Sequence, residues 1–257
     1  MTALSSITMY LDELLSVSTT PDYPPALNGV QVSHRGPVRR IAAAVDCSLR
    51  TITAAAAEGA NLLLVHHGLF WGGLRPLTGP HLERVRALLD SDIALYSAHL
   101  PLDTHPEFGN SALLARALGL TVSGGFARFE SIQCGVRGMV DRETDDLIAH
   151  VTRWAATEGH ATITSRLPAG HRTRRWAICS GAGANADSLR EAYDTGVDLL
   201  IVGEGPHWSA VEAEERGLVI VYAGHYATET LGVRALGAHL QQRFSLPGSF
   251  LAAPTGL

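Results

Sequence analysis

The segment Leu62-Leu63-Leu64-Val65, followed by His66-His67-Gly68, constrains the fold more than any other part of the sequence. An apolar run that stops at polar residues and glycine indicates a buried β-strand whose end opens into a loop. In α/β proteins, binding sites lie at the carboxyl ends of such strands. The two histidines are therefore candidate site residues as well as a strand end.

Strands and helices are expected to alternate through the first half of the chain. The expected strands are 41–45, 61–65 and 93–96, and the expected helices are 6–15, 49–58, 81–89 and 110–118. This order predicts an α/β fold with a largely parallel sheet that helices cover on both faces.

The second half of the sequence repeats the pattern of the first. Residues 175–179 correspond to 40–44, residues 197–202 to 60–65, and residues 221–229 to 95–103. Two arbitrary α/β segments can look alike. Here, however, His225 aligns with His99 and Glu229 aligns with Asp103, each pair just after a strand. We therefore expect an internal duplication, with a first α/β unit at 1–124, a second at 125–257, and a shared site at their interface.

Composition excludes several classes of protein. The chain has 257 residues, 46% of them hydrophobic, yet no apolar stretch is long enough for a membrane helix and the start lacks the features of a signal peptide, so a cytoplasmic protein is expected. The net charge is -5 and no basic run exceeds a pair, which argues against binding to a nucleic-acid backbone. Cys47, Cys134 and Cys179 are far apart in sequence, which favours reduced thiols over a disulfide framework or a cysteine zinc site.

Polar side chains that can bind metal follow three of the expected strands. They are His66 with His67, His99 with Asp103, and His225 with Glu229. Imidazole and carboxylate without thiolate suit zinc, manganese, iron or nickel. Taken singly, each residue has a structural alternative: a hydrogen-bonded histidine, a helix cap or a surface charge. Their joint occurrence at corresponding positions of a duplicated unit favours a metal site.

The spacing of these residues suits two ions better than one. Adjacent residues on a strand point to opposite sides, so His66 and His67 are better placed to bind one ion each than to chelate a single ion. Glu229 follows His225 by four residues, which places both on one side of a helical turn, and a carboxylate can bridge two cations. Two ions roughly 3.5–4 Å apart form the centre of many hydrolases.

Several motifs together resemble one known family. They are Asn28-Gly29-Val30-Gln31-Val32, Val65-His66-His67-Gly68-Leu69-Phe70-Trp71, His99-Leu100-Pro101-Leu102-Asp103 with Gly109-Asn110, Gly203-Glu204, and Gly224-His225-Tyr226-Ala227-Thr228-Glu229. In this order they are similar to the YbgI-like family, the dinuclear-metal-centre hexameric proteins often labelled GTP cyclohydrolase 1 type 2 homologues. The similarity runs nearly from end to end.

The resemblance implies two three-layer α/β/α units, a toroidal homohexamer and two divalent ions per subunit. The ligands that it implies are His66, His67, Asp103, His225 and Glu229, with Glu229 bridging. It places His99 near the metals as an orienting or acid–base group rather than a ligand. The resemblance leaves the role of His207 open.

The function that we expect is that of a metal-dependent hydrolase, with His99 or Glu204 as candidates for proton transfer and ring-opening of GTP as a candidate reaction. The competing hypothesis is a non-catalytic hexamer that binds metal and a ligand or partner in its cavity. A minor alternative comes from Gly181-Ala182-Gly183-Ala184-Asn185-Ala186, which fits a loose dinucleotide-binding pattern but also a tight strand-to-helix turn. Six further histidines outside these motifs are expected to be solvated: His34, His81, His150, His160, His171 and His239. His105, just after Asp103, is expected on the loop surface, with reach to the site as the alternative.

Overall fold

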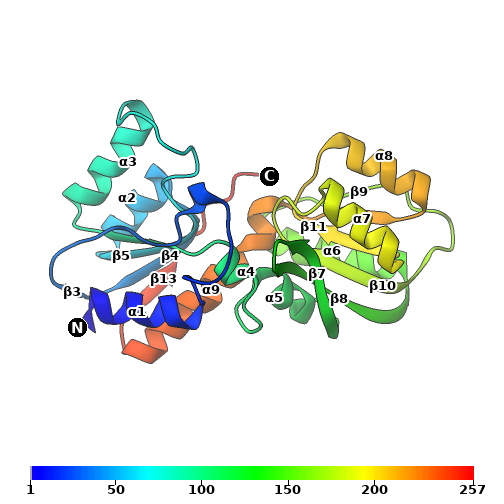
Figure 1. The fold of residues 1–257 in the computed structure, drawn as a ribbon, viewed down its shortest axis with the longest axis horizontal. Helices are drawn as coiled ribbons and strands as arrows, with labels where there is room; N and C mark the ends of the chain where they lie inside the picture. Colours follow the sequence, from blue (N-terminus) through cyan, green and yellow to red (C-terminus); the bar gives the residue numbers. More distant parts are fainter. Residues whose placement is uncertain (1) are drawn as a thin grey trace. The chain divides into compact units, whose positions relative to one another are not determined.

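The computed structural model describes residues 2–257 and divides into two compact units. The first contains the residues up to His105 together with Gly232–Ala253, and the second contains Pro106–Leu231 with Pro254–Leu257 (Figure 1). The chain therefore does not divide at residue 124. The end of the chain returns to the first unit, because strand β13 (Gly248–Phe250) pairs with strand β4 (Ile41–Asp46).

The first unit is built on a five-stranded sheet of order β13-β4-β5-β6-β2. Its further elements are β1 (Thr2–Ala3), α1 (Leu4–Leu14), the 3-10 turn Pro24–Ala26, β2 (Gly29–Val32), β3 (Pro37–Val38), α2 (Leu49–Ala57), β5 (Leu62–His67), α3 (Gly79–Asp90), β6 (Ala94–Ser97), α4 (Leu100–Asp103) and the later part of α9 (His225–Phe244). Strands β13, β4, β5 and β6 are parallel, and β2 is an antiparallel edge strand.

Helices cover both faces of this first sheet. On one face, α2 and α3 pack on alternate strand residues such as Ala42, Leu63 and Leu95. On the other face lie α1 and the later part of α9 (Figure 1). A Cβ added at Gly237 of α9 would lie only 2.9 Å from the Cβ of Ala43, so this helix packs closely on β4. The unit thus has the expected three layers.

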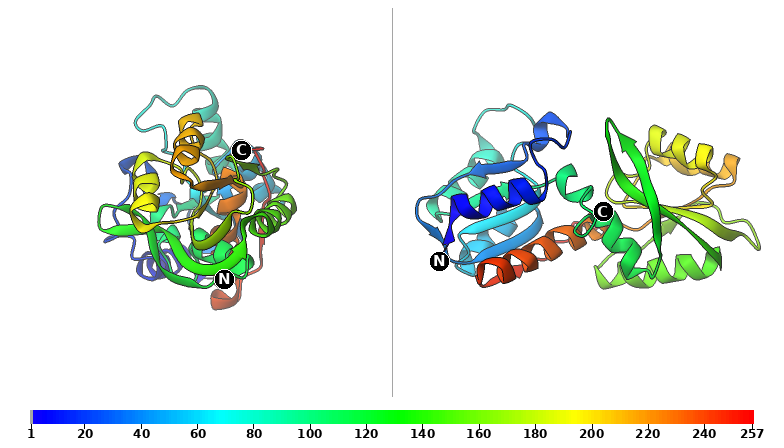
Figure 2. Two further views of the ribbon diagram at one scale, coloured as in Figure 1. Left: turned by 90° about the vertical axis from the view of Figure 1, so that its right-hand side faces the viewer. Right: turned by 60° about the horizontal axis from the view of Figure 1, so that its bottom comes forward.

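The second unit is built on a six-stranded sheet of order β7-β8-β10-β11-β12-β9. Its elements are α5 (Asn110–Ala117), β7 (Val122–Phe129), β8 (Ile132–Glu143), α6 (Thr144–Thr157), β9 (Ile163–Thr164), β10 (Arg172–Cys179), α7 (Ala186–Thr195), β11 (Leu199–Val202), α8 (His207–Arg216), β12 (Val219–Tyr222) and the start of α9. Strands β7 and β8 form a long hairpin, coloured green in Figure 2.

The second sheet is also covered by helices on both faces, because its strand residues alternate between two cores. Trp176 and Ile178 face α5 and α6, whereas Ala177 and Cys179 face α7 and α8. Both units are therefore three-layer α/β/α structures, as expected.

Both sheets contain the same central arrangement. β4-β5-β6 in the first unit and β10-β11-β12 in the second are parallel, and β2 and β9 follow as antiparallel edge strands. These are the strands that the repeated sequence segments contain. An internal duplication predicts this correspondence. No helix among residues 2–257 combines the length and the hydropathy that spanning a membrane requires.

Candidate metal centre

The histidine pair lies at the end of strand β5 in the first unit. The strand extends two residues further than the apolar run indicates, so His66 and His67 are its last residues. Parallel pairing continues to this point, because Asp46 of β4 is the register partner of His67. Pairing with β4 therefore fixes the end of the strand, whereas pairing with β6 ends at Val65, and His66 is fully buried.

His66 and His67 turn toward different neighbouring strands. The Nδ1 atom of His66 lies 2.9 Å from the carbonyl oxygen of Ala98, beyond the end of β6, and Nδ1 of His67 lies 2.9 Å from Oδ1 of Asp46. A carbonyl or carboxylate oxygen can only accept, so both Nδ1 atoms carry the proton. In each ring Nε2 is then the atom that could bind a metal ion.

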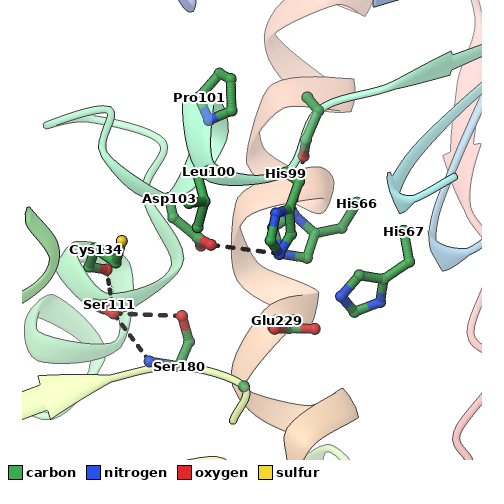
Figure 3. A network of polar contacts seen from close by, with 12 residues as sticks. His66, His67, His99, Leu100, Pro101, Asp103, Ser111, Cys134, Ser180 and Glu229 are labelled. Carbon is green, nitrogen blue, oxygen red and sulfur yellow. Dashed lines mark hydrogen bonds and ion pairs between the residues drawn. The ribbon is translucent and has the colours of Figure 1, made fainter. Parts of the chain in front are cut away.

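Asp103 and His99 complete the group in the first unit. Nε2 of His66 lies 3.5 Å from Oδ2 of Asp103, as Figure 3 shows. His66, His67 and His99 each place one ring nitrogen so that the three nitrogens lie within 4.8 Å of one another. The structure thus brings together the three predicted ligands of the first unit, with His99 beside them.

His99 is held by an acid that the sequence did not indicate. Its Nδ1 donates to Asp22 at 2.8 Å, and Asp22 also accepts from the backbone N–H of Leu100 at 2.9 Å. Burial alone would raise the pKa of Asp22, but the hydrogen bond and the charge of His99 outweigh burial, and the pKa of this carboxyl lies below its ordinary value. Asp22 therefore stays ionised and orients His99.

The second unit contains the other two predicted ligands at the start of α9. Nε2 of His225 lies 3.1 Å from Oε2 of Glu229, and its Nδ1 lies 2.8 Å from Oε1 of Glu204. Burial would lower the pKa of His225, but Glu229 and Glu204 outweigh it and raise the pKa to about 9. Glu204 thus orients this histidine, as Asp46 orients His67.

Glycines of the second unit make room for this pair. Gly181 follows β10 with a φ of +61°, and a Cβ there would collide with Oε1 of Glu229. A Cβ at Gly203 would lie 2.7 Å from the hydroxyl of Thr228 and 2.8 Å from the Cα of His225. The glycine-rich segment 181–186 therefore has a packing role here, and Asn185 within it caps α7 through a capping box.

His207 lies apart from these residues in the chain's second unit. It is exposed at the first position of α8, and Pro206 precedes it. Its side chain has no hydrogen bond or ion pair among the described residues.

Comparison with known proteins identifies the family. The family model for DUF34/NIF3, described as NGG1p interacting factor 3, matches residues 2–252. The chain belongs to the DUF34/NIF3 family. The expected resemblance is confirmed, since a solved structure titled "Structural genomics, protein ybgI, unknown function" is 33% identical, with a TM-score of 0.88 over 98% of this chain and 99% of that one.

Other relatives of this DUF34/NIF3 chain are also similar over almost their whole length. A Deinococcus radiodurans protein named "GTP cyclohydrolase 1 type 2 homolog" is 44% identical over 250 residues, covering 96% of this chain and 92% of the relative. A crystal structure from Thermus thermophilus is 36% identical with a TM-score of 0.86, over 98% of this chain and 99% of that one.

Two groups of side chains that could hold metal ions thus characterise this DUF34/NIF3 protein. Sequence patterns indicated His66, His67, Asp103, His225 and Glu229, but not the carboxylates that orient the rings. Asp46 is the last residue of β4, 21 residues before its partner His67, and Asp22 lies 77 residues before its partner His99. Their orienting role becomes visible only in the structure, where Nδ1 of each partner histidine makes the same contact with a carboxylate oxygen.

Proposed function

We propose that the five predicted ligands bind two divalent metal ions per subunit and that the centre hydrolyses a small-molecule substrate. The ligands are His66, His67 and Asp103 from the first unit and His225 and Glu229 from the second. One observation supports this proposal above the others. In His66, His67, His99 and His225 alike, Nδ1 is bonded to an oxygen acceptor.

That arrangement is typical of metal-binding histidines. A ligating histidine donates its other N–H to a carboxylate or carbonyl, which fixes the tautomer and raises the basicity of the ligand atom. The donor set of imidazoles and carboxylates fits zinc, iron, manganese or nickel. Two such ions, when bound, would polarise the substrate and lower the pKa of a bound water.

The chain's own residues would position the ligands and handle the proton. Glu204 and Asp46 orient His225 and His67, so we assign neither to proton transfer. His99 with Asp22 is the better candidate for an acid–base pair, because the resemblance does not require His99 as a ligand. Its ring lies 4.9 Å from that of His66, within reach of a reacting group bound there.

Metal content tests the centre itself. We expect two ions per subunit in the wild type by elemental analysis, and the loss of at least one in His66→Ala and in Glu229→Ala. His150→Ala, on helix α6 of the second unit, is the matched control and should keep both ions. Unchanged metal content in His66→Ala and Glu229→Ala would contradict the proposed centre.

The candidate reaction is hydrolytic ring-opening of GTP, which the name of the Deinococcus radiodurans relative suggests. Metal-loaded protein should release formate from GTP, and Glu229→Ala should not. His99→Gln should lower kcat strongly while leaving the metal content intact. If the metal-loaded wild type releases no formate, GTP is not the substrate, and the screen continues with other cyclic amides and phosphate esters.

A non-catalytic role is the second candidate, and the family's own description, an interacting factor, favours it. In that case the protein would be a homohexamer whose cavity binds a ligand or partner. Light scattering should then give the mass of six 27.3 kDa chains. Full metal occupancy without any turnover would favour this role over the hydrolase.

A further inference from the structure

Two arginines, Arg75 and Arg84, and the histidine His81 lie together where the loop after the histidine pair enters helix α3 of the first unit. Contrary to the expectation that His81 is solvated, it is only 6% exposed, and its Nδ1 atom is buried with no hydrogen-bond partner among residues 2–257. Its ring meets Phe70 edge to face, with 6.3 Å between the centroids. His81 is therefore held in place by packing, while one ring nitrogen has no partner.

Arg84 and Arg75 stand beside His81. Arg84 follows it by one helical turn, so both side chains project from the same face of α3. The Nε atom of Arg84 is also buried without a partner among the described residues. Burial, followed by the positive charges of Arg75 and Arg84, lowers the pKa of His81. Arg75 packs against the loop, since a Cβ at Gly72 would lie 2.6 Å from its guanidinium carbon.

This group has no acidic counterpart in the described part of the chain. Across residues 2–257, neither Arg75 nor Arg84 makes an ion pair or a hydrogen bond. The first turn of α3 contains no acidic residue, and its N-cap residue Thr78 makes no side-chain capping bond. The positive end of the helix dipole thus adds to the charges of the side chains.

We propose that Arg75, His81, Arg84 and the first turn of α3 bind the phosphate group of a small-molecule ligand. A phosphate offers several acceptor oxygens, which suits two guanidinium groups, an imidazole and the backbone N–H groups of Gly79 and His81 at the start of the helix, where Pro80 has none. A carboxylate would satisfy fewer of these donors and carries less charge.

The position of the group relates it to strand β5. Arg84 is close enough to Cys47 for its charge to act on the thiol, and the N–H of Cys47 donates to the carbonyl of His67 at 2.9 Å. The phosphate site therefore lies at the same end of the first sheet as the histidine pair. It needs no metal ion, so it can be tested apart from the proposed metal centre.

Titration with inorganic phosphate tests the site, using the full chain after treatment with EDTA so that bound ions contribute nothing. We expect saturable binding, with the imidazole resonances of His81 shifting in heteronuclear NMR spectra. Arg75→Gln and Arg84→Gln should each weaken binding by about tenfold or more, since each removes charged hydrogen bonds. Arg86→Gln is the matched control: it changes the same charge on the same helix, at an exposed position, and should leave binding unchanged.

GTP and guanosine, titrated in the same way, distinguish a ligand-borne phosphate from the free ion. Tighter binding of GTP than of inorganic phosphate, with guanosine not shifting His81, supports the proposal. Equal weakening by Arg84→Gln and Arg86→Gln would overturn it, because binding would then follow net charge alone. Phosphate binding that leaves the His81 resonances in place would overturn it as well. Neither result would bear on metal content, so the two proposals can fail separately.

Discussion

At the scale of single residues, the orientation of the imidazoles is decided before any ligand binds. The backbone carbonyl of Ala98 holds His66, and carboxylates hold the other three rings. A ring whose tautomer and direction are already fixed loses little conformational freedom when it binds an ion. The carboxylates of Asp46, Asp22 and Glu204 therefore orient the rings of the candidate site, although they are not predicted ligands.

Gly181 offers a test of how the second unit positions Glu229. Gly181→Ala should reduce metal content, because the added Cβ collides with the Glu229 carboxylate. Gly217→Ala is the control, since Gly217 has a similar φ of +71° but open space around it. Elemental analysis of both variants separates the collision from backbone strain, and equal metal loss in the two would refute the steric explanation.

Cys47 is predicted to be chemically inert in the folded protein. It is a buried thiol, and burial raises its pKa to about 12, with the charge of Arg84 opposing this only in part. Thiolate is the reactive form, so iodoacetamide at pH 8 should not label Cys47 in the native chain but should label it in urea. Peptide mapping by mass spectrometry measures both, and rapid native labelling would contradict the assigned pKa.

The same thiol makes stability depend on pH in one direction. In the unfolded chain a cysteine ionises near pH 8.5, whereas in the fold it stays protonated, so the unfolded state binds fewer protons above that pH. The buried, protonated thiol therefore contributes its full stabilisation of the fold below about pH 8.5, and this stabilisation is lost as the pH rises from there toward 12. Urea unfolding should show a smaller alkaline loss of stability in Cys47→Ala than in the wild type.

At the scale of secondary-structure elements, the two units share a detail beyond strand order. The side-chain oxygen of Asn61 accepts from the backbone N–H of Arg39 at 2.8 Å, just before β4. Asp198, at the matching position of the second unit, accepts from the N–H of Arg175 at 2.7 Å within β10. The same side-chain position ties two neighbouring strands together in both units, which further supports a duplication.

Asn61 and Asp198 should contribute similar amounts to the free energy of unfolding, as well as lying at matching positions. Asn61→Ala and Asp198→Ala should each cost about 1–3 kcal/mol of unfolding free energy, because each leaves backbone N–H groups without an acceptor. Asp198→Asn keeps an acceptor oxygen and should cost less. Urea denaturation of the three variants measures this, and a negligible loss in Asn61→Ala would show that the contact is not structurally important.

The sequence predicted those helices and strands whose own residues show a clear apolar run or capping pattern. Leu62–Val65 is apolar throughout, and Ser48 caps helix α2 through a capping box with Thr51, so both elements are visible in the local sequence. It did not predict β7, whose first two residues are exposed and which contains Gly124 and Gly125. It also missed that β13 joins the first sheet, because three residues near the chain end say nothing about a partner some 200 positions earlier.

The candidate site was predictable to a similar degree. His66 and His67 are adjacent in sequence, and His225 and Glu229 are one helical turn apart, so their spacing alone indicated shared chemistry. The orienting acids had no such spacing, and among the proposed phosphate-site residues only His81 and Arg84 are one helical turn apart. His81 looked like a solvated helix residue, and only the folded loop shows that Phe70 covers it.

At the scale of the whole molecule, the first unit is discontinuous and the second is nearly an insertion within it. A chain ending at residue 231 has almost all of the second unit but lacks β13 and the later part of α9, which belong to the first. Limited proteolysis of such a chain should leave residues 106–231 largely protected and digest residues before 105. Protection of the early residues in that truncated chain would show that β4, β5 and β6 hold together without β13.

The return of β13 to the first sheet also sets the order of events on the ribosome. The strand that carries His66 and His67 emerges early, yet the edge strand of the same sheet is made last. At a synthesis rate of roughly 5–20 residues per second, that delay is on the order of ten seconds. During it, one edge of β4 stays open, while almost all of the second unit, residues 106–231, is made before β13. A chaperone that binds extended apolar segments would therefore bind the amino-terminal half of the nascent chain during this delay.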